Sequence, residues 1–165
     1  MASGLTNQYV QRLMHQISLY PNKFYGVLPC DHFLNLMKNS QGKWNFGDCF
    51  IVNLSASGHS GSHFVAVHVT SKTTAEYFDS YAMSYDIDNN LTHAFDLAKL
   101  KIDANDKRIQ DDASQFCGFY CVAFLLYRQA NLSTETFMDV FDSINLKYND
   151  VIVVELLKTL IDKNL

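Results

Sequence analysis

The chain has 165 residues, of which 48% are hydrophobic and 18% charged, with 2 Pro and 7 Gly. This composition is typical of a compact globular protein and excludes disordered and collagen-like chains, and the length predicts a single domain over 1–165. The 13 basic and 17 acidic residues give a net charge of −4 without any basic run, so charge does not indicate nucleic acid as a ligand.

Apolar runs and cysteines predict a protein that works where thiols stay reduced. The longest apolar runs, such as 151–154, are far shorter than the ~18–20 residues that span a bilayer, and the first residues lack the apolar segment of a secretory signal. The four cysteines form no CxxC pair and no evident disulfide framework. We therefore expect no secretion, no membrane association and at least one cysteine kept for its reactivity. The four are Cys30, Cys49, Cys117 and Cys121.

Two helices are predicted near the start of the chain. The segment 6–19 carries apolar residues at i, i+3, i+4 and i+7, which is the spacing of one helical face, and Pro21 follows as a stop. A shorter helix is predicted over 32–38, with Asp31 as its N-cap.

The following segment predicts a sheet. Residues 48–55 are rich in strand-forming side chains, and 63–70 alternates valines with other residues. A polar turn over 71–74 leads to 75–80. Segments 63–70 and 75–80 are therefore predicted to form an antiparallel hairpin.

The second half of the chain is predicted to be mainly helical. A weaker helix is expected near 92–100 and a short strand over 107–110. The run 117–130 is apolar nearly all round, which is typical of a buried central helix, and further helices are predicted from Ser133 and after Asn149. Helices, a small mixed or antiparallel sheet and more helices indicate the α+β class.

Cys117 is the candidate nucleophile. It follows a polar stretch and stands at the predicted start of the most apolar helix. Unpaired N–H groups and about half a positive charge at a helix N-terminus favour the thiolate over the thiol. Gly118 is expected to leave room for an incoming acyl group. Cys121, one turn later, is expected to be structural.

Hairpin geometry selects a base for this cysteine among six histidines, at positions 15, 32, 59, 63, 68 and 93. If the hairpin closes over 71–74, cross-strand partners have numbers that sum to about 142–145. His63 and Asp79 satisfy this relation. The carboxylate would then fix one imidazole nitrogen and leave the other free for the thiol.

Acyl transfer also needs donors for the developing oxyanion. The backbone N–H of Cys117 supplies one. Gln110 and Gln115 both qualify as the second by their chemistry, and spacing alone does not rank them. A zinc site built on Cys117, Cys121 and two histidines is the rival interpretation, but no CxxC or HxxxH spacing supports it, so we expect no metal and no cofactor.

Three motifs, in the order His, Asp, Gln, Cys, resemble the catalytic motifs of adenain, the adenovirus-type cysteine endopeptidase, and of its distant cousins, the SUMO proteases. They are GSHFVAVHV (61–69), EYFDSYA (76–82) and IQDDASQFCGFYCVAFL (109–125). The segment 24–33 resembles the part of the family before its first core strand, and 148–157 resembles the end of the short forms in virophages and Polinton-type viruses.

The resemblance implies a papain-like cysteine protease architecture with His63, Asp79, Gln110 and Cys117 as catalytic residues. Gln110 is chosen because the family's oxyanion glutamine lies six or seven residues before the cysteine. Two departures exist: Phe64 stands where the family usually has Trp, and the acid is Asp79 where adenain has Glu. The peptide and DNA activators of the adenovirus enzyme are not carried over, since the chain has no basic stretch or evident docking cysteine.

The implied function is a viral endopeptidase that matures capsid or core precursor proteins, which are its expected partners, and acts as a monomer in the virion and the host-cell interior. It would cleave next to small, Gly-rich residues through an acyl-enzyme on Cys117, with His63 acting first as base and then as acid. The alternatives are a protease of SUMO or ubiquitin-like tails, an acetyltransferase with no visible cofactor-binding extension, and a catalytically silent binding module.

Overall fold

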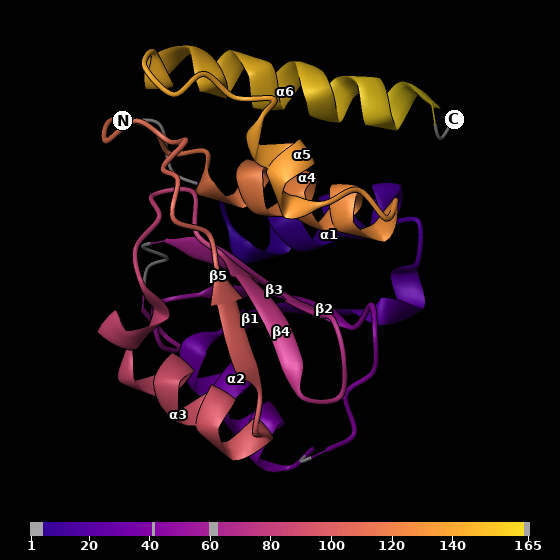
Figure 1. Cartoon of the computed structure of the whole chain (residues 1–165), viewed down its shortest axis with the longest axis vertical. Helices are drawn as coiled ribbons and strands as arrows, with labels where there is room; N and C mark the ends of the chain where they lie inside the picture. Colours follow the sequence, from indigo (N-terminus) through magenta and orange to yellow (C-terminus); the bar gives the residue numbers. More distant parts are fainter. Residues whose placement is uncertain (1–4, 41, 60–62, 164–165) are drawn as a thin grey trace.

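A computed structural model describes residues 5–40, 42–59 and 63–163. Its centre is a five-stranded sheet in the order β1-β2-β3-β4-β5 (Figure 1). Strand β3 is antiparallel to both β2 and β4, whereas the two outer strands run parallel to their neighbours. The strands are β1 (Phe24–Pro29), β2 (Cys49–Asn53), β3 (Phe64–Val69), β4 (Thr74–Phe78) and β5 (Lys101–Ala104).

Helices cover both faces of this sheet (Figure 1). Helices α2 and α3 lie on one face, α1 and α4 lie on the other, and α6 packs outside α4. The α+β prediction with a mixed sheet flanked by helices is therefore confirmed. The helices are α1 (Asn7–Ile17), α2 (Cys30–Lys38), α3 (Asn89–Ala98), α4 (Cys117–Gln129), α5 (Thr134–Met138) and α6 (Leu146–Lys163), with 3-10 turns at Pro21–Lys23 and Tyr85–Ile87.

The alternation in β3 divides the core into two halves. Phe64 and Ala66 point toward α1 and α4, whereas Val65, Val67 and Val69 point toward α2 and α3. Every residue of β3 is buried because helices cover both faces. On the α4 side, the ring of Phe124 stacks on Phe78 at 4.6 Å between centroids. This packing places the two ends of the hairpin beside the start of α4.

Local signals predict several boundaries well. The side chain of Thr6 accepts a hydrogen bond from the Tyr9 N–H and caps α1. Ser133 caps α5 in the same way. The hairpin register pairs Ala66 with Phe78 and His68 with Glu76, within the predicted range.

Other predictions need correction at the edges of the sheet. Residues 24–29 form strand β1, which was not predicted, because its pairing with β2 is parallel and distant in sequence. The edge strand after α3 is β5, at 101–104, not 107–110. Residues 107–110 form a loop. The N–H groups of Ile109 and Gln110 both donate to the same carbonyl, that of Ser80, and so do not form the regular hydrogen bonds of paired strands.

Two helix starts also differ from prediction. Helix α2 begins at Cys30, and Asp31 does not cap it: the Asp31 carboxylate accepts from the N–H and hydroxyl of Ser57. Helix α6 begins at Leu146, so Asn149 lies inside it. These starts depend on contacts with other segments, which local spacing does not encode.

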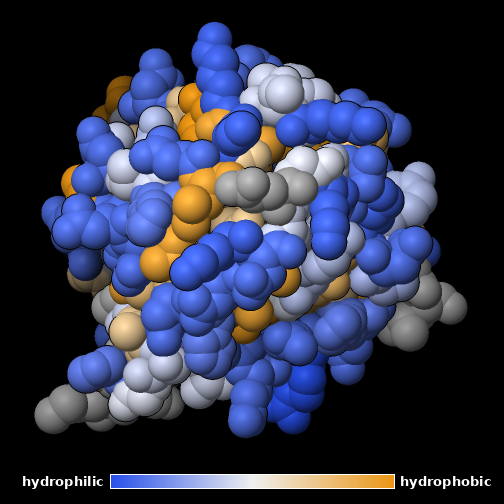
Figure 2. Space-filling model, turned by 90° about the horizontal axis from the view of Figure 1, so that it is seen from below, coloured by the Kyte–Doolittle hydropathy of each residue, from blue (hydrophilic) through white to orange (hydrophobic). Residues whose placement is uncertain are grey.

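The outer surface on the α2 and α3 side is mostly hydrophilic, with a band of apolar side chains across it (Figure 2). Within the described ranges, no helix is both long and apolar enough to cross a bilayer.

Candidate active site

Cys117 is the first residue of α4, as predicted, and is 8% exposed. Phe116 precedes it as N-cap without a side-chain hydrogen bond to the helix. The first N–H groups of an α-helix have no intrahelical partner, so the thiol lies beside the positive end of α4.

His63 immediately precedes β3, and Asp79 immediately follows β4. The Nε2 atom of His63 lies 2.9 Å from Oδ1 of Asp79, and both side chains are buried. Since a carboxylate only accepts, Nε2 donates in this contact. His63 and Asp79 therefore lie beside each other, as predicted.

The other imidazole nitrogen is left for the thiol. Among the described residues, Nδ1 of His63 has no hydrogen-bond partner of ordinary geometry. Burial disfavours the charged imidazole, but hydrogen bonding and the negative charges of Asp79 and Cys117 outweigh burial and raise the pKa of His63 to about 9. Cys117 is thus close enough to influence the imidazole, and the site favours the imidazolium at neutral pH.

Asp79 is held by two residues that the sequence analysis missed. Its Oδ1 accepts from the N–H of Tyr81 at 2.7 Å, a local turn that could have been anticipated from an Asp directly after a strand. The side chain of Asn105 accepts from the Asp79 N–H and donates to the Asp79 carbonyl, both at 2.8 Å. Asn105 thereby continues the β4–β5 pairing and fixes the backbone of the acid.

Tyr81 connects the histidine with the loop before α4. Its ring lies 4.9 Å from the His63 ring, and its hydroxyl donates to the carbonyl of Ser114 at 3.1 Å. The guanidinium of Arg108 lies 5.3 Å from the centre of the same ring. The tyrosine therefore covers one side of the imidazole.

The structure separates the two glutamines that spacing left tied. Gln110 is fully buried, and its Nε2 donates to the hydroxyl of Ser114 at 2.9 Å and to the Ser114 carbonyl at 3.2 Å. Its Oε1 accepts from the hydroxyl of Ser80. Gln115 is exposed. Only Gln110 is therefore fixed in the loop that leads into α4.

Gly118 has a different role from the one expected. A Cβ added there would lie 2.8 Å from Val10 Cγ2 and 3.0 Å from Leu5 Cδ1. The glycine therefore lets the N-terminal segment and α1 pack closely on α4. The expectation that it clears space for an acyl group is wrong, because packing of the chain's own residues occupies that side.

The remaining cysteines are free thiols in the core. Burial raises the pKa of Cys49 to about 12 and that of Cys121 well above its ordinary value. Burial also raises the pKa of Cys30. Cys121 is therefore a structural residue, as predicted.

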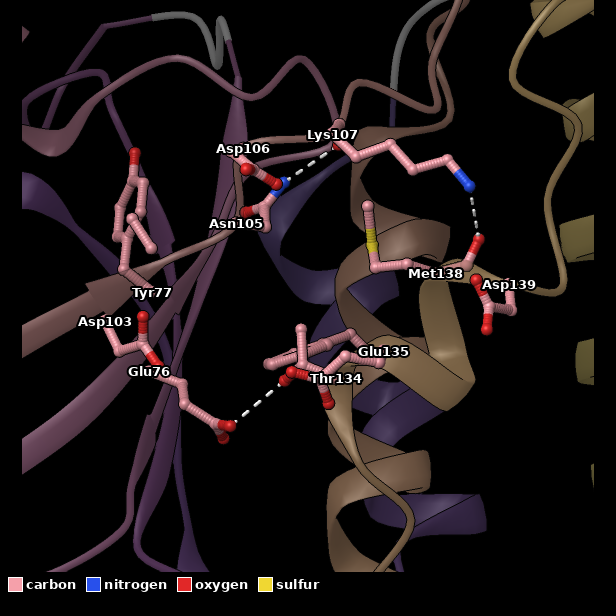
Figure 3. A pocket seen from close by; sticks show the side chains of 12 residues that line it. Glu76, Tyr77, Asp103, Asn105, Asp106, Lys107, Thr134, Glu135, Met138 and Asp139 are labelled. Atoms are coloured by element: carbon pink, nitrogen blue, oxygen red, sulfur yellow. Dashed lines mark hydrogen bonds between the residues drawn. The ribbon is translucent and has the colours of Figure 1, made fainter.

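A cavity of about 390 Å³ lies between the β4–β5 edge and α5, away from this site (Figure 3). Carboxylates dominate its lining, but Glu76 already binds Arg128 and Thr134, and Lys107 donates to the carbonyl of Met138. Neither His63 nor Cys117 lines it. Within the described ranges, no cluster of His, Cys, Asp or Glu could hold a metal ion.

No family model matches the chain, and no curated protein matches it. Solved structures do resemble it. AvrA, in a structure with IP6 and CoA, superposes with a TM-score of 0.54 at 18% identity over 90% of this chain and 54% of its own, so the chain spans about half of AvrA. SUMO protease Ulp1 gives a TM-score of 0.47 at 16% identity over 96% of this chain and 79% of its own.

The ASFV pS273R protease superposes with a TM-score of 0.51 at 16% identity, over 96% of this chain and 67% of its own. At such identities the likeness concerns the fold and not the residues. The chain therefore has the mixed α+β fold that the ASFV pS273R protease and AvrA share.

Proposed function

We propose that the protein is a cysteine endopeptidase in which Cys117 attacks the peptide bond, His63 transfers protons and Asp79 orients His63. The observation that carries this proposal is the buried 2.9 Å contact between His63 and Asp79, with Nδ1 left for a cysteine at the start of α4. The fold shared with the ASFV pS273R protease supports it. A silent binding module would not need a buried, charged histidine.

The raised pKa of His63 sets the order of proton transfers. With a pKa of about 9, His63 is protonated at neutral pH, and a cysteine thiolate is its natural counter-ion. The thiolate forms a bond to the carbonyl carbon, and the imidazolium gives its proton to the leaving amine as the C–N bond breaks. In this proposal, His63 acts as acid in acylation and as base in deacylation.

Deacylation then uses the neutral imidazole. His63 takes a proton from water, the hydroxide adds to the acyl carbon, and the C–S bond breaks to release the acid and restore the thiolate–imidazolium pair. The Cys117 N–H and the Gln110 amide are the proposed oxyanion donors. Each residue proposed from the sequence therefore takes part in this cycle, and His63 takes part in both halves.

We further propose that the substrates are viral capsid or core precursor proteins, cleaved next to small, Gly-rich residues in the virion or the host-cell interior. This rests on the motif resemblance to adenain and on the fold shared with a viral protease. The protein is proposed to act as a monomer, without nucleic acid, in keeping with its net charge of −4.

Acyl transfer from CoA is the second candidate, because AvrA was solved with CoA and has the same fold. An acyl-enzyme on Cys117 would serve both reactions, which differ in the acyl donor, a peptide bond or a CoA thioester, and in the acceptor, water or an amine. We favour hydrolysis because the chain covers only 54% of AvrA but 67% of the pS273R protease.

The test is incubation of the purified protein with the capsid precursors encoded by the same genome, followed by sequencing of new N-termini. Cleavage after small residues that is absent with Cys117→Ser supports the proposal. A second assay adds acetyl-CoA to the same precursors. Acetylation of the precursors without cleavage would support the transferase instead. No reaction in either assay would contradict both candidates.

A further inference from the structure

Two consecutive residues of the outer helix α6 contact the loop that carries Gln110. Asn149 is fully buried and donates from Nδ2 to the carbonyl of Ile109 at 2.8 Å. Asp150 accepts at Oδ1 from the hydroxyl of Ser114, also at 2.8 Å. Helix α6 therefore holds this loop on both sides of Gln110.

The side-chain amide of Gln110 could fit its site in two orientations. Its oxygen and its NH₂ group have nearly the same shape, so hydrogen-bond partners decide which end faces which way. The hydroxyls of Ser80 and Ser114 contact opposite ends of the amide. Since a hydroxyl can donate or accept, these two hydroxyls alone would permit either orientation.

The Ser114 carbonyl, which only accepts, already favours the NH₂ end on this side at 3.2 Å, and Asp150 adds a second constraint through the closer Ser114 hydroxyl. A carboxylate only accepts, so it takes the single hydroxyl proton of Ser114. The Ser114 oxygen can then only accept, and it does so from Gln110 Nε2 at 2.9 Å and from the Phe116 N–H at 3.2 Å. Together with the Ser114 carbonyl, this hydroxyl therefore directs the NH₂ end of Gln110 toward the segment that leads into α4.

Asp150 is itself fixed from the core. Its Oδ1 also accepts from the hydroxyl of Tyr120 at 2.9 Å. Burial and the neighbouring carboxylate raise the pKa of Tyr120, which keeps the phenol protonated and donating. The carboxylate is thus held in place from α4 as well as from the loop.

We propose that Asp150 is a positioning residue for the oxyanion site: through Ser114 it keeps the NH₂ end of Gln110 directed toward the start of α4, while Asn149 fixes the adjoining backbone. The longer Gln110 contact, with the Ser114 carbonyl at 3.2 Å, is the one that a substrate oxyanion would replace. The inference rests on the proposed function, since it assigns Gln110 the oxyanion role.

The experiment compares Asp150→Asn with Glu155→Gln, a matched acid-to-amide change at an exposed position of the same helix. An asparagine can donate to Ser114, which frees the hydroxyl proton for Gln110 and leaves only the longer contact with the Ser114 carbonyl to oppose the reversed amide. Single-turnover acylation by a cleaved peptide should fall about tenfold in Asp150→Asn, less than the 10²–10³-fold loss of a deleted oxyanion donor. The loss should lie in kcat rather than KM, and Glu155→Gln should match the wild type.

Alkylation of Cys117 by iodoacetamide separates positioning from a general structural effect. In this reaction the sulfur forms a bond to a saturated carbon and iodide leaves, so no oxyanion develops. Cys117 in the Asp150→Asn variant should therefore be alkylated at the wild-type rate. In a Gln110→Ala background, Asp150→Asn should cause no further loss of the acylation rate. Equal losses of alkylation and acylation, or additive losses in the double variant, would overturn the inference.

A spectroscopic measurement tests the inference independently of activity. Side-chain NH₂ protons of Gln110 should show nuclear Overhauser contacts with Ser114 in the wild type, and these should weaken or shift toward Ser80 in Asp150→Asn. Unchanged contacts would overturn the positioning role even if peptides are cleaved. An inactive wild type that shows the expected change would instead contradict only the proposed function.

Discussion

Two helix starts in this protein carry a cysteine, and only one has the surroundings of a nucleophile. Cys30 is the first residue of α2, and Cys117 is the first residue of α4. Both are buried, at 2% and 8% exposure. The position at a helix N-terminus is therefore not what distinguishes them.

The neighbours distinguish them. Cys30 donates to the Leu54 carbonyl and accepts from Asn90, both at 3.3 Å. Burial raises its pKa, and the carboxylates of Asp88 and Asp31 raise it further. Cys117 instead faces a histidine that Asp79 keeps charged. A helix dipole is a small effect, so the charged histidine beside Cys117 is the feature that separates the two sites.

The largest expected effect comes from removing the charge that distinguishes the two sites. Asp79→Asn should lower kcat by up to about 10⁴-fold, the scale known for the acid of a catalytic triad. An asparagine oxygen can still accept from the Tyr81 N–H, so the fold should remain. Turnover and melting temperature are measured together, and near-wild-type turnover would show that Asp79 does not orient His63.

The next largest effect is expected from removing a side chain that is proposed to bind the transition state at the Cys117 site. Gln110→Ala should lower the acylation rate about 10²–10³-fold with little change in substrate affinity, because the donor is used most in the transition state. Gln115→Ala is the control and should cost far less, since Gln115 is exposed. A larger loss at Gln115 in single-turnover assays would reverse the assignment.

Direct labelling compares the two thiols within one molecule. Near neutral pH, an alkylating reagent should modify Cys117 faster than Cys30 by roughly tenfold or more, because the thiolate fraction sets the rate. Quenched time points analysed by peptide mass spectrometry give both rates. Asp79→Asn should reduce the ratio of the Cys117 labelling rate to the Cys30 labelling rate. Faster labelling of Cys30 than of Cys117 in the wild type would contradict the comparison.

The smallest effect concerns stability and pH. Since the folded pKa of His63 is about 9 against 6.5 for the ordinary side chain, its stabilising contribution is complete below pH 6.5 and is lost as the pH rises through 9. At about 1.4 kcal/mol per pKa unit, the contribution is at most about 3 kcal/mol. Denaturant unfolding at several pH values gives the free energy of unfolding of the wild type and of His63→Ala. The difference between the two should decrease as the pH rises from 6.5 through 9. A constant difference would contradict the raised pKa.

The sequence alone determined the parts of the site that are close along the chain. His63 and Asp79 are 16 residues apart, and one hairpin whose alternation and turn are visible in the sequence brings them together. The helix that begins at Cys117 is likewise visible from its apolar run and polar approach. Local periodicity fixes such neighbours because few chain conformations satisfy it.

Tertiary packing decided the rest. Strands β1 and β5 pair in parallel with β2 and β4, respectively. No tight turn joins either pair, so the sequence contains no turn signal that predicts the pairing. The resemblance to adenain favoured Gln110 over Gln115, and the structure adds that Gln110 is buried and Gln115 exposed. The role of Gly118 and the hydrogen bonds of Asn149 and Asp150 depend on α1 and α6 packing on α4. Ser114 and Asp150 are 36 residues apart and Ile109 and Asn149 are 40 apart, and only the packed helix brings these polar groups within hydrogen-bond distance.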